Sequence, residues 1–321
     1  MRVLVTGGTG YLGRAVVHAL AVAGHEPVVF ARTAIASGLP GLLVNGDVRN
    51  GAALHQAAEG CEALCHMAAV VSQWRPRRQD FDEVNVGGLE QALAAAAARG
   101  IRRIVYTSSF LALPPAGGTT PLRANDYQRT KVEAEHVAAA AARDGAPLVR
   151  VYPGVVYGPG APTEGNLVGR LIADHLAGRL PGVIGPEHIW SYADIDDVAR
   201  GHVAALEQGR IGAQYRLGGE NVPQMRLFET VRAITGHRLP RRIPFGVARA
   251  IGLAEELRAR ISGRAPLLTR GTVEIFQHDW SLDSAAAVAD LGYRITPLAE
   301  GLGRTVAALT GSGRTPGDAE R

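Results

Sequence analysis

The sequence predicts an α/β fold, a doubly wound parallel sheet followed by a smaller C-terminal lobe, and three observations support this class. Short β-branched runs alternate with alanine-rich helical stretches through the first two-thirds of the 321 residues. A glycine-rich turn, residues 6–13, joins the first such run to the first helical stretch. The helical stretches stop at glycines, which commonly end helices: Gly24, Gly60, Gly100 and Gly145.

The individual elements follow in order from this alternation. We expect strands at 2–6, 27–31, 42–45, 62–67, 102–107 and 147–152. Between them we expect helices at 11–23, 50–59, 81–99 and 126–143. Crossover connections between parallel strands are right-handed, so this order predicts helices on both faces of one sheet.

After about Tyr157 the pattern loosens into loops rich in glycine and proline and shorter helices, expected at 165–178, 195–207, 224–235, 246–261 and 283–291. We therefore divide the chain into a first domain over 1–156 and a mixed α/β substrate lobe over 157–310. Some elements of this lobe can return to the first sheet. The polar tail 311–321 is expected to be disordered.

Composition argues against several classes of protein. The net charge of +4 is small and the arginines are scattered, so nucleic acid is not an expected partner. The clusters Arg75, Arg77, Arg78 and Arg238, Arg241, Arg242 are expected to be solvated. Without an 18-residue apolar run or a leader segment, we expect a cytoplasmic protein with no membrane partner. Two cysteines, Cys61 and Cys65, are too few for a disulfide framework or a structural zinc site, so we expect no metal.

Residues 6–13, T-G-G-T-G-Y-L-G, predict a dinucleotide site. The early glycines, Gly7 and Gly10, allow a tight turn and a close approach of backbone N–H groups to a pyrophosphate. The last glycine, Gly13, allows the helix to pack closely on the strand. The motif lies between an expected strand and an expected helix, which is the context it requires in a Rossmann domain.

Three residues further along the chain fit the adenosine end of such a cofactor. Arg32 ends the second strand, where NAD enzymes often carry a carboxylate, so it can pair with a 2′-phosphate. This favours NADP, with NAD as the alternative. Asp47 can accept a hydrogen bond from the adenine amino group, and Val48 can flank the ring. The alternatives are a solvated loop arginine and a turn-forming aspartate.

Tyr127 and Lys131 are candidates for acid/base chemistry. Four residues apart at the start of an expected helix, they lie on one face. An ammonium favours the tyrosinate, so the phenol can exchange a proton with a hydroxyl or carbonyl near neutral pH. Lys131 is the only lysine among 34 basic residues, which supports a role that arginine cannot fill. Ser109 ends the fifth strand, where ligands bind in such sheets.

Several motifs together resemble the extended short-chain dehydrogenase/reductase family over nearly the whole chain. They are T-G-G-T-G-Y-L-G, His66-Met-Ala-Ala69, Asn85-Val-Gly-Gly88, Tyr106-Thr-Ser-Ser109, Y-x-x-x-K and Tyr152-Pro-Gly-Val-Val-Tyr-Gly-Pro-Gly160. Within the family, residues 178–182, 196–206 and 217–221 resemble the dihydroflavonol-reductase-like branch, which includes farnesol dehydrogenases and hopanoid-associated sugar epimerases.

The resemblance implies a catalytic triad. Tyr127 would be the acid/base, Lys131 would lower its pKa and hold the nicotinamide ribose, and Ser109, rather than Ser108, would polarise the substrate oxygen. Asn85 would stabilise the central helix and the cofactor site. A homodimer through the helices at 81–99 and 126–143 is also implied. The implied cofactor contacts are Gly7, Thr9, Gly10, Tyr11, Leu12, Arg32, Asp47, Val48, Met67, Ala68, Ala69, Thr107, Ser108, Tyr127, Lys131, Tyr152, Pro153, Gly154 and Val155.

The expected substrate contacts are mostly apolar: Val70, Val71, Trp74, Ser109, Tyr157, Asn166, Leu167, Trp190 and Tyr192. Such a set suits an isoprenoid, steroid-like or aryl compound better than a sugar nucleotide. For any single one, a place in the core is an equal alternative. We therefore expect hydride transfer between a nicotinamide and a hydrophobic alcohol or carbonyl. The alternatives are a nucleotide-sugar epimerase or dehydratase and a non-catalytic protein that senses NAD(P).

Two features depart from the family pattern. Only 18 positions separate Ser109 from Tyr127, so the loop 110–125 is expected to be trimmed and the pocket more open. Asp194 stands where the family has a histidine, which puts the local substrate contacts in doubt. An equal interpretation of Asp194 is a helix N-cap.

Overall fold

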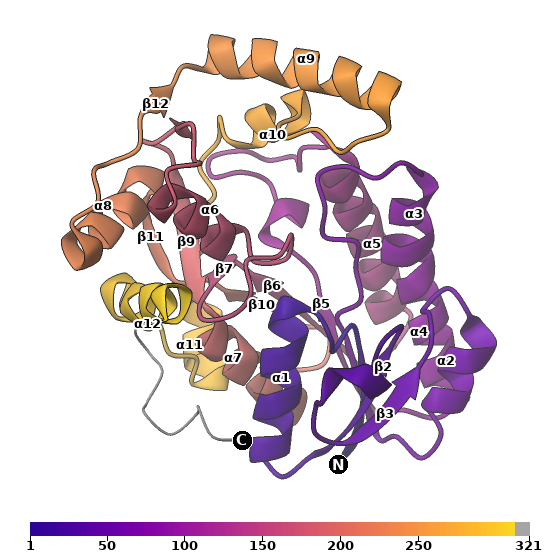
Figure 1. Ribbon diagram of the computed structural model, residues 1–321. Coiled ribbons are helices and arrows are strands. Elements are labelled where there is room, and N and C mark those ends of the chain that lie inside the picture. The colour runs from indigo at the N-terminus through magenta and orange to yellow at the C-terminus, as the bar shows by residue number, and fades with distance from the viewer. Residues whose placement is uncertain (312–321) are drawn as a thin grey trace.

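A computed structural model describes residues 1–311, and its centre is a seven-stranded sheet (Figure 1). All neighbouring strands of this sheet are parallel, and their order is β10-β6-β5-β4-β1-β2-β3. The strands are β1 (Arg2–Thr6), β2 (Glu26–Ala31), β3 (Leu42–Asn45), β4 (Ala63–His66), β5 (Arg103–Thr107), β6 (Leu148–Pro153) and β10 (Gln214–Leu217). The predicted doubly wound sheet is confirmed.

Helices cover both faces of the sheet because successive side chains of each strand point to opposite faces. Val3 and Val5 of β1 pack in one core with α1 (Tyr11–Val22), α7 (Ile195–Gln208) and α11 (Ala285–Leu291). Leu4 packs in the other core with α2 (Gly51–Ala57), α4 (Gly88–Ala98) and α5 (Asp126–Arg143). The strand ends are in register, so Thr6, His66 and Tyr106 lie side by side at one edge of the sheet.

The helix expected at 81–99 is interrupted near its start. A short helix α3 (Gln79–Phe81) leads into a π-helical turn η2 (Asp82–Gly87), and only then does α4 begin. A π turn holds one residue more than an α turn and often marks a functional site. Its one buried residue is Asn85, which the sequence had singled out.

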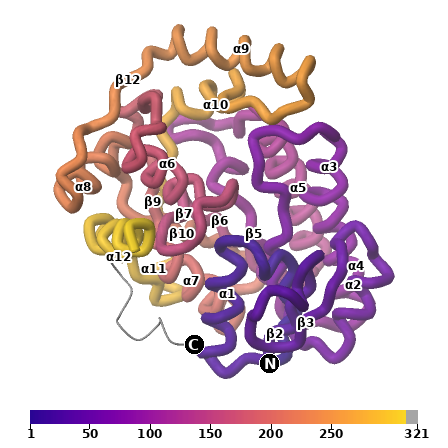
Figure 2. Tube along the Cα trace, in the orientation of Figure 1, coloured from indigo at the N-terminus to yellow at the C-terminus, as the bar shows by residue number. Residues whose placement is uncertain are grey.

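The rest of the chain forms a second layer of structure beside the sheet (Figure 2). A three-stranded sheet contains β7 (Val155–Tyr157), β9 (Ile189–Asp194) and β11 (Glu220–Pro223), and β8 (Val183–Ile184) pairs with β12 (Arg242–Ile243). The helices are α6 (Leu167–Leu176), α8 (Gln224–Thr235), α9 (Phe245–Ser262), α10 (Arg270–Ile275) and α12 (Leu298–Thr310). Two 3-10 turns, η1 (Ile35–Ser37) and η3 (Phe110–Ala112), complete the described elements.

Two elements from the range 157–310 are part of the first domain's layers. Strand β10 extends it beyond β6, and α7 packs against α1 on one of its faces. The division into two lobes at residue 156 therefore remains a prediction about organisation, since the chain crosses back. Residues 312–321 of the tail 311–321 lie outside the described part. Among the described helices, none combines the length and apolar character needed to cross a bilayer.

Candidate active site

The turn between β1 and α1 is shaped by glycines that leave no room for a side chain. Gly7 adopts a left-handed conformation with φ of 73°, and a Cβ there would lie 2.7 Å from the Ala68 Cα. A Cβ on Gly13 would lie 2.2 Å from the Gly7 carbonyl oxygen. Gly10 donates its N–H to that same oxygen at 3.0 Å and forms the N-cap of α1 without a capping side chain. This cradle of backbone groups at a helix N-terminus fits a pyrophosphate.

The residues predicted to contact the adenosine end of the cofactor differ in the hydrogen bonds and ion pairs they already make within the protein. Arg32 is exposed after β2 and makes no hydrogen bond or ion pair with the part of the chain that the structure describes. Asp47 instead accepts two hydrogen bonds from the Arg49 guanidinium, at 2.7 and 3.0 Å. These bonds hold the pKa of Asp47 below its usual value, and Arg32 contributes in the same direction. Val48 is buried against Gly88 of α4.

Tyr127 and Lys131 lie in the first two turns of α5. The helix starts where it does because the Asn125 side chain accepts a hydrogen bond from the Gln128 N–H at 2.8 Å. The Lys131 ammonium is buried and donates to the Thr107 carbonyl at 3.1 Å. Burial lowers the pKa of Lys131 to about 8, and Glu135 acts in the opposite direction.

The phenol of Tyr127 shares its surroundings with Ser109 and not with Ser108. Burial raises the pKa of Tyr127, and a hydrogen bond with the Ser109 side chain lowers it by less. The Ser108 hydroxyl points elsewhere and donates to Glu135 at 2.8 Å. In this chain alone desolvation outweighs the hydrogen bond with Ser109, so the pKa of Tyr127 lies above its usual value, and the expected lowering by Lys131 stays a prediction. A neutral phenol beside a serine hydroxyl suits donation of a proton to a substrate oxygen.

Asn85 connects three parts of the site. Its side-chain oxygen accepts from the Val70 N–H at 2.7 Å, in the loop after β4. Its amide donates to the Thr130 hydroxyl at 2.9 Å, and Thr130 precedes Lys131 on α5. The buried amide thus fixes the loop after β4 relative to the helix that carries Tyr127 and Lys131.

Glu135 is a partly buried residue of the candidate site that no sequence motif indicated. Its carboxylate accepts hydrogen bonds from Ser108 at 2.8 Å, Arg150 at 2.8 Å and the Tyr152 hydroxyl at 2.5 Å. Tyr152 therefore points toward α5 rather than into the cofactor region. Tyr127, Lys131 and Glu135 are spaced by four residues, so helical periodicity would have placed Glu135 on the catalytic face.

An aromatic cluster adjoins Ser109. Phe110 follows Ser109 and lies 5.6 Å from the Trp280 ring centroid and 6.2 Å from that of Trp190. Trp190 also contacts Phe276 at 4.6 Å between centroids. Of these, only Trp190 was expected from the sequence; the others lie in loops and a short helix, where no motif marks them. The expected contacts Val70, Val71, Trp74 and Leu167 are all partly or fully exposed.

Two expected substrate contacts lie inside the protein, so their role toward a substrate stays a prediction. Tyr157 is fully buried, with its hydroxyl directed at Gly301 of α12. Asn166 is fully buried as the N-cap of α6, where its amide oxygen accepts from the Gly169 N–H at 2.9 Å. The Asn166 side chain is engaged in internal hydrogen bonds and the Tyr157 ring in core packing, while the Tyr157 hydroxyl has no hydrogen-bond partner among the described residues. Trp190 and Tyr192 are also buried in the core, so for them the alternative of a core position gains support.

Asp194 is the N-cap of α7, which was the alternative interpretation of this residue. Its side chain caps α7 by accepting from the Asp196 N–H at 3.0 Å, and Arg304 pairs with it at 2.7 Å. Burial raises the pKa of Asp194. Nothing in this arrangement requires a substrate, so the departure from the family pattern is accounted for by capping.

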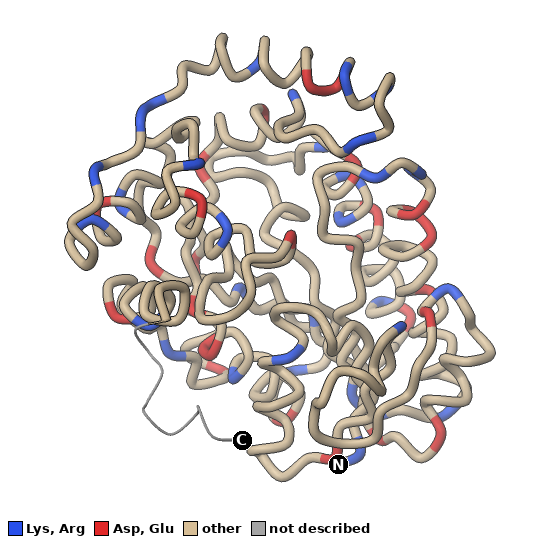
Figure 3. The backbone as a smooth tube through the Cα atoms, viewed as in Figure 1, with Lys and Arg blue, Asp and Glu red and all other residues tan. Residues whose placement is uncertain are grey.

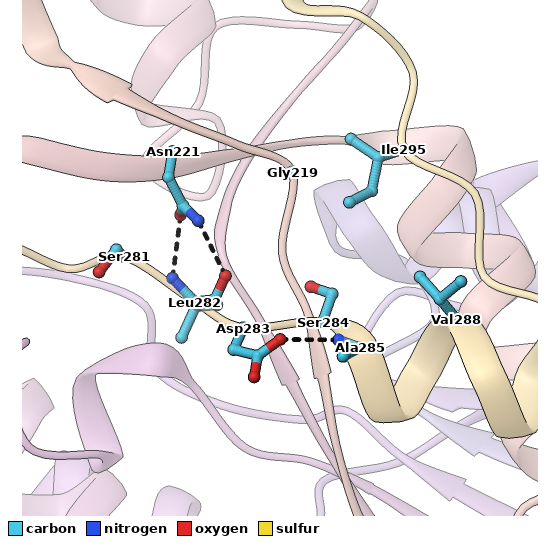
Figure 4. A pocket seen from close by; sticks show the side chains of 9 residues that line it. All are labelled: Gly219, Asn221, Ser281, Leu282, Asp283, Ser284, Ala285, Val288 and Ile295. Carbon is cyan, nitrogen blue, oxygen red and sulfur yellow. Dashed lines mark hydrogen bonds between the residues drawn. The ribbon is translucent and has the colours of Figure 1, made fainter.

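A surface hollow of about 450 Å3 lies between β11, α11 and the loops beside them (Figure 4). It is lined by Gly219, Asn221, Ser281, Leu282, Asp283, Ser284, Ala285, Val288 and Ile295. The Asn221 side chain brackets Leu282 by bonding both its N–H and its carbonyl, and Ser284 accepts from the Gly218 N–H. The polar groups of this hollow thus serve the packing of two chain segments, and it contains none of the candidate catalytic residues.

Three relatives match the chain along nearly its whole length. Sterol demethylase protein B of Methylococcus capsulatus is 31% identical over 308 residues, which cover 91% of this chain and 93% of the relative. A Synechocystis protein named as a dihydroflavonol 4-reductase is 31% identical and covers 90% and 88%. A 2-alkyl-3-oxoalkanoate reductase of Stenotrophomonas maltophilia is 31% identical and covers 91% and 94%. The predicted resemblance to the dihydroflavonol-reductase-like branch is confirmed.

A solved structure and a family model agree with these relatives. The crystal structure of gox2253 superposes with a TM-score of 0.81 at 30% identity, covering 98% of this chain and 99% of that one. The model of the NAD dependent epimerase/dehydratase family matches residues 3–218, which include the glycine cradle, Tyr127 and Lys131. The chain belongs to the NAD dependent epimerase/dehydratase family of extended short-chain dehydrogenases/reductases and is an NAD(P)-dependent oxidoreductase.

Proposed function

We propose that this protein is a carbonyl reductase or alcohol dehydrogenase that prefers NADP and acts on a hydrophobic substrate. The observation that carries the proposal is the half-buried phenol of Tyr127, kept neutral by burial beside Ser109. A neutral phenol is the form needed to protonate the oxygen of a ketone or aldehyde as it is reduced. The aromatic cluster that begins at Phe110 places apolar surface next to this donor.

In the reductive direction the reaction needs one hydride and one proton. A nicotinamide dinucleotide held by the glycine turn between β1 and α1 would supply the hydride for the carbonyl carbon. Ser109 donates a hydrogen bond to the carbonyl oxygen, and Tyr127 transfers its proton to that oxygen. The tyrosinate left behind is stabilised by the nearby Lys131 ammonium, whose lowered pKa allows it to exchange a proton near neutral pH. The oxidative direction runs the same transfers in reverse.

The preference for NADP rests on Arg32. Its guanidinium is exposed at the end of β2 and unengaged by the described residues, so it is free to bind a 2′-phosphate with two hydrogen bonds. The carboxylate of Asp47, in contrast, is already paired with Arg49, which weakens its expected role toward adenine. NAD remains the alternative cofactor.

The substrate class follows from the chemistry around Ser109 and from the relatives. The partly exposed contacts after β4 and at the start of α6 are aliphatic or aromatic, and they offer no cation for a nucleotide diphosphate. One relative is named for sterol demethylation and another for reduction of a 2-alkyl-3-oxoalkanoate. We therefore propose an isoprenoid, steroid-like or aryl alcohol or its carbonyl as substrate.

The test is an initial-rate assay of nicotinamide absorbance. Purified protein is given NADPH or NADH with a panel of isoprenoid, aryl and steroid carbonyls, and NADP or NAD with the matching alcohols. We expect turnover that falls at least about a thousand-fold in Tyr127→Phe. The matched control is Tyr215→Phe. It removes a tyrosine hydroxyl from the edge strand β10, where that hydroxyl donates a hydrogen bond to Asp290.

The outcome also separates this function from its competitors. Tight cofactor binding without net turnover on the panel, together with interconversion of a nucleotide sugar, would support an epimerase, because an epimerase returns its nicotinamide to the starting state. An unchanged biological output in Tyr127→Phe would support a non-catalytic sensor. We also propose a homodimer through α4 and α5, and a monomer in light scattering would refute it.

A further inference from the structure

Helix α9 (Phe245–Ser262) exposes large apolar side chains on its outer side. It lies along one end of the molecule, far from the N-terminus, and rests on α10 (Figures 1 and 2). The exposed side chains and their exposed fractions are Val247 51%, Ile251 43%, Leu253 44%, Leu257 49% and Ile261 89%, with Leu267 at 87% in the loop that follows. No other described helix presents so many.

The inner side of the same helix consists of small residues. Its buried positions are Ala248, Gly252 and Ala259. A Cβ on Gly252 would lie 3.0 Å from the backbone nitrogen of Arg270, so the helix approaches α10 closely there. Helices of globular proteins normally turn their large apolar residues inward. In α9 the order is inverted, because the small residues face the protein and the large ones face outward.

The segment around α9 also carries the excess positive charge of the chain. Residues 238–270 contain eight arginines and two glutamates, a net charge of +6, whereas the whole chain carries +4 (Figure 3). Both glutamates are paired, Glu255 with Arg258 and Glu256 with Arg270. Within the described residues, no ion pair engages Arg238, Arg241, Arg242, Arg260 or Arg264.

The α9–α10 unit rests on the loops that border the substrate side of the site. A Cβ on Gly271 of α10 would lie 2.1 Å from the Ala124 carbonyl oxygen, three residues before Tyr127. Thr272 of α10 donates a hydrogen bond to the Gln73 side chain at 3.0 Å, in the loop after β4. A surface bound by α9 would therefore lie next to the loops that receive the substrate.

We propose that α9 docks the protein on the surface of an anionic lipid bilayer. Exposed apolar side chains flanked by unpaired arginines are what an interfacial helix uses to enter the headgroup region of anionic lipids. The positive charge favours this surface over a second copy of the chain, since two copies meeting through α9 would bring two segments of +6 together. That the bilayer also delivers the substrate rests on the function proposed above; the docking itself does not.

Flotation with lipid vesicles tests the docking without measuring turnover. The full-length protein is mixed with vesicles of phosphatidylcholine alone or with phosphatidylglycerol at one part in four. We expect binding to the anionic vesicles that weakens at least about ten-fold in Leu257→Asp/Ile261→Asp. Val22→Asp, at a position 90% exposed at the end of α1, is the matched control and should bind as the native chain does.

A second pair of variants tests the electrostatic part. Arg241→Gln/Arg242→Gln should bind the anionic vesicles more weakly, and added salt should reduce the difference from the native chain. Native protein that does not float with anionic vesicles, or floats equally well after Leu257→Asp/Ile261→Asp, overturns the proposal. Light scattering that shows a dimer lost in that variant would also overturn it, because α9 would then be an interface between copies.

The same variants separate this inference from the proposed function. Each should turn over a short, water-soluble carbonyl at the native rate, because none lies in the cofactor or catalytic site. Vesicle binding without any carbonyl reduction would leave docking intact and refute the function. Carbonyl reduction without vesicle binding would support the proposed function and refute the docking.

Discussion

Replacing Gly13 with alanine tests whether the cradle between β1 and α1 depends on close backbone packing. Gly13 lies in the first turn of α1, where alanine is otherwise the better helix former by about 1 kcal/mol. The added Cβ would lie 2.2 Å from the Gly7 carbonyl oxygen and 2.9 Å from the Gly8 Cα. Ordinary contact begins near 3.4 Å, so the turn would have to move by about 1.2 Å.

The cost of that movement can be worked from the contacts of Gly7. Its carbonyl accepts the Gly10 N–H, and its own Cα leaves no space toward Ala68, so the turn cannot simply retreat. Overpacking costs ~1–3 kcal/mol and a lost hydrogen bond about 1 kcal/mol. After the gain in helix propensity, we expect a net loss of about 2 kcal/mol in the free energy of unfolding.

The assay pairs urea unfolding with titration of NADPH fluorescence. Because this turn forms the proposed pyrophosphate site, NADPH affinity should fall at least about ten-fold, or ~1.4 kcal/mol. Gly303→Ala in α12 is the control, since a Cβ there meets nothing within 4 Å and should stabilise the protein slightly. If Gly13→Ala behaved like Gly303→Ala in both measurements, the packing argument would be refuted.

Three further predictions concern charges and hydrogen bonds in the site. Glu135→Gln removes the carboxylate that raises the pKa of Lys131, so this pKa should fall below about 8 and the alkaline limit of kcat/KM should move to lower pH; Glu133→Gln on the same helix should leave the profile unchanged. Arg32→Asp should reduce kcat/KM for NADPH at least about ten-fold relative to NADH, and an unchanged ratio would contradict the role of Arg32. Asn85→Ala leaves the Val70 N–H without a partner and should cost ~1–3 kcal/mol in urea unfolding, and a variant as stable as the native chain would contradict this role of Asn85.

The first half of the fold was predictable because each element follows a local rule. All six strands expected before residue 153 are present, and the helix at 126–143 has the predicted bounds because Asn125 caps it and Gly145 follows its end. The interrupted helix before α4 was not predicted. A π turn arises from the tertiary hydrogen bonds of Asn85, which no sequence period reveals.

In the second half all five expected helices are present, as α6, α7, α8, α9 and α11, whereas the strands were not predicted because they are short and depend on partners far along the chain. Strand β9 gains its pairing from β7 and β11, and α10 has only six residues. In the site, the motifs indicated Tyr127, Lys131 and Ser109, whereas Phe110 and Trp280 meet only in three dimensions. The burial of Tyr157 and the capping role of Asn166 were not predicted, because a motif does not reveal either.

The return of β10 to the outer side of β6 has a consequence for biosynthesis. A nascent chain that has emerged only as far as residue 156 presents β6 as an unpaired strand edge and lacks α7 over the core beside α1. Open edges of this kind recruit other chains and aggregate. More than sixty further residues must therefore leave the ribosome before β10 can complete the sheet of the nucleotide-binding half. A fragment that ends at residue 156 would lack this strand and α7.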